Sequence, residues 1–108
     1  MMQINLNTAL HDVVHRLVEV YEPERIYLFG SVARGESGAD SDYDVLVIVP
    51  DDAPEKRRRS QLAYEALWGL NVAVDVLVWT KTAFESRLHL KASLPSTVTR
   101  EGKLLYAA

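Results

Sequence analysis

The segment GSVARGESGADSDYD, residues 30–44, lies between two apolar runs, RIYLF at residues 25–29 and VLVIV at residues 45–49. Both runs are short and rich in aliphatic, β-branched or aromatic residues, a composition typical of strands. The segment between them begins with Gly-Ser and ends with two aspartates one residue apart. Its many Gly, Ser and Asp residues predict a turn or short helix followed by a loop. The sequence therefore predicts two strands joined by a strongly polar connection.

The rest of the chain continues this alternation of helices and strands. The pattern predicts, in order, a helix from Leu6 to about Pro23, strands at Arg25–Phe29 and Asp42–Val49, a helix from Asp52 to about Gly69, a strand at Val72–Trp79, a helix that begins at Thr80, a last short helix after Pro95, and a small edge strand at Lys103–Tyr106. This order favours an α/β (α+β) fold, a small sheet of three to four strands with helices packed on it.

Composition and charge limit the classes of protein to which the chain can belong. With 108 residues, of which 48% are hydrophobic and 25% charged, the chain is expected to form a single folded domain over residues 1–108. A net charge of −3 argues against bulk electrostatic binding of long nucleic acid. Cysteine is absent, and neither a signal peptide nor a membrane-spanning run is evident, so a cytoplasmic location is the default expectation.

Strand alternation places Asp42 and Asp44 on the same face of the second predicted strand. Their Cα atoms are about 7 Å apart in an extended chain, so both carboxylates can converge on one cation. Tyr43 lies between them in the sequence and is expected to pack on the opposite side of the sheet. The pattern predicts an acidic face at the start of this strand.

Asp75 interrupts an otherwise apolar third strand, VAVDVLVW, and a carboxylate in such a run is expected to be at least partly buried. One interpretation is an edge strand whose aspartate faces solvent or pairs with an arginine. The other is that the second and third strands are neighbours, so that Asp42, Asp44 and Asp75 bind one metal site. Mg²⁺ prefers a few carboxylate oxygens together with substrate phosphates, which such a cluster would offer.

Gly30 and Ser31 fit a phosphate site beside these carboxylates. A glycine at the end of a strand lets the backbone turn closely, and the amide and hydroxyl of Ser31 at a helix start can donate to a phosphate oxygen. Arg34 follows within reach of a bound triphosphate, where it either contacts phosphate or forms a structural salt bridge. Each feature alone is weak, but their spacing makes the combination specific.

These residues resemble the minimal nucleotidyltransferases of the DNA polymerase β superfamily, whose signature is Gly-Ser, ten residues, then Asp-x-Asp. Here the signature is Gly30, Ser31, the ten residues 32–41, and then Asp42 and Asp44. The wording FGSVARGESGADSDYDVLV is similar to that family, and the likeness covers about residues 8–79 well and the tail weakly. The resemblance implies the nucleotidyltransferase core of the DNA polymerase β type, with a small mixed sheet.

The resemblance also implies roles for individual residues. Asp42 and Asp44 would bind two Mg²⁺ ions that bridge the triphosphate of ATP, while Gly30 and Ser31 would hold its β and γ phosphates. Asp75 would be a ligand of the catalytic metal and would help to deprotonate the acceptor hydroxyl. Every catalytic position of the family has its residue in this sequence.

The spacing is similar to that of the antitoxin members, which are encoded beside a HEPN-domain ribonuclease toxin. That likeness implies transfer of AMP from ATP to a tyrosine hydroxyl of the toxin partner, within a hetero-oligomer, which neutralises the toxin. Two alternatives stay open: an antitoxin that sequesters the toxin without catalysis, and a transferase for a small molecule such as an aminoglycoside. The second is disfavoured because the nucleotidyl-transfer core uses all 108 residues and leaves no acceptor domain.

Two further motifs favour ordinary surface roles. HDVVH at residues 11–15 resembles the zincin motif with Asp in place of Glu, but no third ligand is evident and both histidines are expected on the helix surface. The basic run of residues 56–59, KRRR, is typical of a solvated helix face. Its alternative is contact with an acidic or RNA-bound partner.

Overall fold

The computed structural model describes residues 8–33, 35 and 43–108, and its elements follow the predicted order. The elements are α1 (Thr8–Tyr21), β1 (Arg25–Phe29), α2 (Gly30–Ala33), β2 (Tyr43–Val49), the 3-10 helix η1 (Glu55–Arg58), α3 (Gln61–Ala66), β3 (Val74–Thr80), α4 (Lys81–Glu85), α5 (Leu94–Glu101) and β4 (Lys103–Ala107). The predicted bounds of β1 are confirmed, whereas β3 begins two residues later than predicted. Within the described residues, no helix is long and apolar enough to cross a membrane.

The four strands form one mixed sheet in the order β3-β2-β1-β4. β1 pairs antiparallel with both β2 and β4, whereas β2 pairs parallel with β3. A parallel pair needs a crossover connection, and residues 50–73, which contain η1 and α3, supply it. β3 and β4 are the edges of this sheet, and the polar segment of the sequence leads into its central strand β2.

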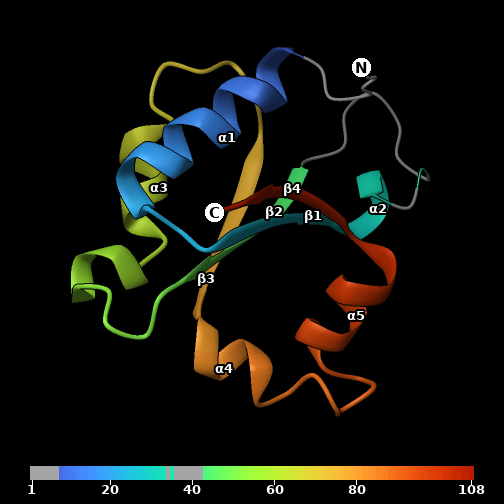
Figure 1. Ribbon diagram of the computed structural model, residues 1–108. Helices are drawn as coiled ribbons and strands as arrows, with labels where there is room; N and C mark the ends of the chain where they lie inside the picture. Colours follow the sequence, from blue (N-terminus) through green and yellow to red (C-terminus); the bar gives the residue numbers. More distant parts are fainter. Residues whose placement is uncertain (1–7, 34, 36–42) are drawn as a thin grey trace.

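Helices cover the sheet on both faces, with α1 and α3 on one side and α4 and α5 on the other (Figure 1). Strand alternation divides the apolar residues between two cores. The core on the side of α1 includes Leu17, Tyr21 and the valines of β2 at positions 45, 47 and 49, all fully buried. The other core is smaller and joins Leu46 and Ile48 of β2 to Phe84 and Val98. β2 is therefore buried on both faces, as a central strand should be.

The helix predicted from Asp52 to Gly69 is wrong in its continuity, because the chain forms η1 and α3 with a break between them. Arg59 is extended at that break, with φ −117° and ψ 142°. Tyr21 of α1 donates a hydrogen bond from its hydroxyl to the Arg59 carbonyl at 2.5 Å. This hydrogen bond satisfies the Arg59 carbonyl, which has no partner within a continuous helix at the break. An ion pair of 2.6 Å between Arg57 and Glu22 holds the same segment against the end of α1.

The two last helices begin with the expected capping chemistry. Thr80 accepts a hydrogen bond from the Ala83 amide at the start of α4, and Ser93 accepts one from the Ser96 amide at the start of α5. Pro95 does not merely break the chain, because it lies in the first turn of α5, where a helix needs no amide donor.

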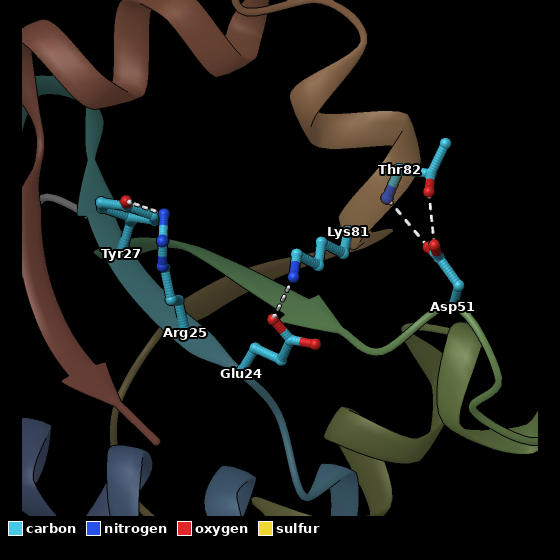
Figure 2. Close-up of polar contacts among 6 residues, drawn as sticks. All are labelled: Glu24, Arg25, Tyr27, Asp51, Lys81 and Thr82. Atoms are coloured by element: carbon cyan, nitrogen blue, oxygen red, sulfur yellow. Dashed lines mark hydrogen bonds and ion pairs between the residues drawn. The ribbon is translucent and has the colours of Figure 1, made fainter.

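Polar contacts fix the junction between the strand ends and α4 (Figure 2). Asp51 follows β2, and its carboxylate accepts hydrogen bonds from the amide and the hydroxyl of Thr82 in α4. Lys81 beside it pairs with Glu24 at 3.7 Å. The chain after β2 and the start of α4 are thus joined at the end of the sheet opposite to Asp44.

Candidate active site

Asp44 and Asp75 are direct neighbours across the parallel strands β2 and β3. Adjacent strands lie about 4.8 Å apart, and residues in register point to the same face of the sheet. The strand adjacency on which the predicted metal site depends is therefore present in the structure. Asp44 is half-buried, and its other neighbour is Phe29, the last residue of β1. The two carboxylates thus leave one face of the sheet side by side.

Gly30 forms one wall of the space around Asp44. It follows Phe29 and has φ +78°, in the left-handed region that favours glycine. A Cβ added at this position would overlap Oδ2 of Asp44 and would lie 3.1 Å from its Cγ. The absence of a side chain is therefore what lets the Asp44 carboxylate lie against the backbone at the strand end, where the chain turns into α2.

Asp75 is exposed, so the expectation of partial burial is wrong, and the alternative of an edge strand whose aspartate faces solvent is confirmed. The reason is topological: β3 is an edge strand, and α4 and α5 cover the same face only farther along, at Leu46, Ile48 and Trp79. Asp75 has no ion-pair partner among the residues that the structure describes, so the predicted alternative of a pair with arginine is not seen there. Its carboxylate is open to solvent beside Asp44.

The remaining predicted residues are only partly placed. Asp42 and Arg34 lie outside the described residues, and for Ser31 the structure describes the backbone, in α2, but not the side chain. Tyr43 packs against the core on the α1 side, as strand alternation predicts. Residues 8–33, 35 and 43–108 contain no group of three acidic, histidine or cysteine side chains that could hold a metal ion.

The described part of the site nevertheless fits a hard divalent cation. Asp44 and Asp75 offer carboxylate oxygens from adjacent strands, which are the ligands that Mg²⁺ prefers in proteins. Mg²⁺ also keeps water or substrate phosphate among its ligands, and the exposure of Asp75 leaves room for them.

Both histidines of the HDVVH motif and one apolar residue of β3 are exposed on the surface. His11 and His15 are exposed on α1, as expected, and His15 lies 3.8 Å from Glu19. Sequence reasoning did not single out Leu77, which follows Asp75 on the same face of β3 and is 42% exposed. The alternation of side chains along β3 was the available signal, because it places residues 75, 77 and 79 in one row.

Comparisons with known proteins agree with this geometry. The family model for the nucleotidyltransferase domain matches residues 10–105. A chain from a crystal structure of a toxin–antitoxin with AMP-PNP is 28% identical, with a TM-score of 0.59 over 90% of this chain and 73% of that one. A chain of a toxin–antitoxin MntA-HpeT mutant, with two aspartates two positions apart changed to glutamate, is 24% identical, with a TM-score of 0.58 over 95% and 75% of the two chains.

The second of these likenesses supports the fold alone. No curated protein matches the sequence. The family model covers most of the chain and includes Gly30, Asp44 and Asp75, the residues that the structure brings together. The chain therefore belongs to the nucleotidyltransferase domain family.

Proposed function

We propose that this protein is an Mg²⁺-dependent adenylyltransferase that moves AMP from ATP to a tyrosine hydroxyl of a HEPN-domain ribonuclease toxin in the cytoplasm, and so acts as its antitoxin. The observation that carries the proposal is the register pair Asp44 and Asp75, which lies beside Gly30 in a chain of the nucleotidyltransferase family. The likeness to a toxin–antitoxin chain crystallised with AMP-PNP supports both the nucleotide and the partner.

The reaction is an in-line displacement at the α phosphorus of ATP. The acceptor oxygen forms a bond to that phosphorus, the bond from phosphorus to the bridging oxygen breaks, and pyrophosphate leaves. Asp42, Asp44 and Asp75 would hold Mg²⁺, which stabilises negative charge on the entering and leaving oxygens when it is bound. Asp75 is exposed, so its carboxylate can accept the proton of an acceptor hydroxyl that arrives from solvent.

Gly30, Ser31 and Arg34 would position the triphosphate. The left-handed backbone at Gly30 turns the chain close to Asp44, which places the first amides of α2 near the carboxylate pair. Backbone amides and a hydroxyl can donate hydrogen bonds to phosphate oxygens without adding bulk. Arg34 would add a positive charge near the β and γ phosphates. Positioning and electrostatic stabilisation then account for most of the catalysis.

A partner protein supplies the acceptor in this proposal. Residues 10–105 belong to the nucleotidyltransferase domain, so little of the described chain is left to build a separate acceptor domain. The carboxylate pair lies on an open part of the sheet face, at an edge strand, where another protein can reach it.

The test is intact-mass spectrometry of the partner after incubation with nucleotide. The protein is purified together with the protein encoded beside its gene, incubated with ATP and MgCl₂, and the partner's mass is measured. We expect the partner to gain one or more AMP units with the natural protein and none with Asp75→Asn. Asp52→Asn, a change of an exposed carboxylate outside the site, is the matched control and should transfer normally.

Three outcomes separate the competing functions. Loss of AMP transfer in Asp75→Asn with the complex intact supports the catalytic antitoxin. A partner that is bound and neutralised but never modified would overturn catalysis in favour of sequestration. Full transfer by both Asp44→Asn and Asp75→Asn would show that the carboxylate pair is not the site.

A further inference from the structure

A groove of about 460 Å³ runs along the outer edge of β3. Leu77, Val78 and Trp79 form one side of it, and residues 58–61, at the break between η1 and α3, form the other. β3 has β2 as its single strand partner among the residues described, so its outer edge carries no strand. The groove therefore exposes the backbone of an edge strand together with apolar and basic side chains.

Backbone groups along the outer edge of β3, of which those of Val78 lie in the groove, can pair with an extended peptide. The Tyr43 amide donates to the Ala73 carbonyl at 3.0 Å, which shows that the peptide groups of Ala73 point toward β2. In a strand the direction alternates from one residue to the next, so those of Val74, Val76 and Val78 point away from β2. An edge of this kind is the surface to which an extended segment of another protein adds as a strand.

The groove is continuous with the candidate active site. Asp75, Leu77 and Trp79 lie in one row on the same face of β3. At about 3.3 Å per residue, Trp79 is about 13 Å from Asp75 along the strand. A segment extended along this edge therefore covers the distance from the groove to the carboxylate pair with about four of its own residues.

The charged residues that line the groove, Arg58 and Arg59, are both basic, although the whole chain carries a net charge of −3. Arg58 lines it, is exposed, and forms no ion pair within 4.0 Å among the residues that the structure describes, although its charge also attracts the nearby Glu55. Arg59 also lines it but pairs with Glu55 at 2.5 Å, and the Arg87 guanidinium lies 5.7 Å from the ring centre of Trp79. One unpaired arginine beside apolar side chains fits an acidic residue of a protein segment better than the many phosphates of a nucleic acid.

We infer that this groove, which is named here the β3 edge groove, binds the acceptor segment of the partner protein. In this arrangement an acidic residue of that segment lies beside Trp79 and pairs across the groove with Arg58, and an apolar residue covers Leu77. The hydroxyl that receives AMP then lies four positions farther along the segment, at Asp75. The inference rests on the proposed adenylyl transfer and adds the rule by which the acceptor is chosen: a hydroxyl side chain about four residues from an acidic one.

The rule is tested with synthetic peptides as acceptors. Each peptide has one tyrosine, one glutamate and one leucine, and the two peptides of a pair have identical composition. In one, glutamate lies four positions from tyrosine and leucine lies midway, two positions from each; in the other, tyrosine and glutamate are adjacent. Both chain directions are made, and transfer of AMP from ATP with MgCl₂ is followed by mass spectrometry. We expect the spaced peptide in one direction to react up to about fivefold faster, as loss of a solvent-exposed charge pair predicts.

Matched variants assign the effect to the groove. Arg58→Glu should lower transfer to the spaced peptide about fivefold, and a peptide with lysine in place of glutamate should restore it. Lys56→Glu changes the same basic run outside the groove and should have little effect. Leu77→Ser is compared with Leu104→Ser on the opposite edge strand, because Leu104 is 54% exposed and its change controls for lost surface apolarity.

Binding of AMP-PNP with MgCl₂ is measured for every variant. Unchanged binding together with the expected peptide results supports the inference. Equal rates for the two peptides would overturn the inference, as would equal effects of Arg58→Glu and Lys56→Glu. It would also be overturned if Arg58→Glu alone lost binding of AMP-PNP, or if Arg58→Glu alone lost binding of single-stranded RNA. If AMP-PNP binds but neither peptide reacts, the groove inference fails alone. If AMP-PNP does not bind at all, the proposed function fails with it.

Discussion

Any side chain at Gly30 would both strain the backbone and overlap the carboxylate of Asp44. Its backbone has φ +78°, and the space where a Cβ would lie is occupied by the carboxylate of Asp44. Gly69 has a similar backbone, with φ +91°, but nothing lies within 4 Å of its missing Cβ. The pair of glycines therefore separates backbone strain from direct contact with the candidate active site.

We expect Gly30→Ala to abolish binding of AMP-PNP with MgCl₂, because the new methyl group displaces the Asp44 carboxylate. Both Gly30→Ala and Gly69→Ala should lower the free energy of unfolding by about 1–2 kcal/mol, the cost of a left-handed residue with a side chain. Gly69→Ala should keep its nucleotide binding. Calorimetric titration and urea unfolding measure the two quantities, and equal nucleotide binding by both variants would contradict the role given to Gly30.

The buried hydroxyl of Tyr21 is expected to lower the free energy of unfolding at alkaline pH. Burial is the main cause that raises its pKa from 10.0 to about 12. Between these values the unfolded state has lost a proton that the folded state keeps, so this contribution to stability is complete below pH 10 and is lost as pH rises toward 12. We expect the urea midpoint of Tyr21→Phe to decrease less steeply above pH 10 than that of the natural protein. At neutral pH the free energy of unfolding of Tyr21→Phe should be about 1 kcal/mol lower, because the hydrogen bond to the Arg59 carbonyl is lost.

Tyr64→Phe is the control for this titration, since the Tyr64 side chain is 58% exposed. It should leave the alkaline profile of the natural protein unchanged. A Tyr21→Phe protein that loses stability above pH 10 as steeply as the natural one would show that another group sets the limit.

At the scale of elements, the contact between Asp51 and α4 connects the end of β2 to the helix that covers the second core. Hydrogen bonds from the hydroxyl and the amide of Thr82 lower the pKa of Asp51 below its ordinary value of 3.8. A carboxylate with a lowered pKa stabilises the fold above pH 3.8, and this contribution is lost as pH falls through the lower folded value.

We therefore expect Asp51→Ala to lower the urea midpoint at neutral pH and to differ less and less from the natural protein as pH falls below 3.8. Asp52→Ala, the adjacent exposed carboxylate, should match the natural protein at both ends of this range. A difference between Asp51→Ala and the natural protein that persists unchanged in acid would show that the effect does not come from the ionised carboxylate.

The elements also show what a single sequence can and cannot predict here. The alternation of side chains correctly predicted that Asp44 and Tyr43 face opposite sides, and the apolar runs located three strands and their helices. The exposure of Asp75 was one of two interpretations that the sequence left open, because the choice depends on β3 being an edge strand, which is a property of the strand order. The break at Arg59 depends on a hydroxyl from α1, distant in sequence.

At the scale of the whole molecule, two buried layers make β2 the most enclosed strand, yet the acidic pair lies at its open beginning. The buried interior of the sheet therefore holds the register of Asp44 and Asp75, while Asp75 itself is exposed. The sequence alone did not predict that β2 and β3 are neighbours, because many topologies accommodate the same order of elements. Their adjacency was only assumed, since the predicted metal site requires it.

The parallel pairing of β2 with β3 also sets the order of events as the chain folds. The strand pair β1 and β2 requires only the connection of residues 30–42, whereas residues 50–73 must cross the sheet before β3 can align with β2. Closing the longer loop loses more entropy before any contact compensates for it, so this pairing is expected to form late. Asp44 and Asp75 are therefore expected to come into register only when this crossover closes.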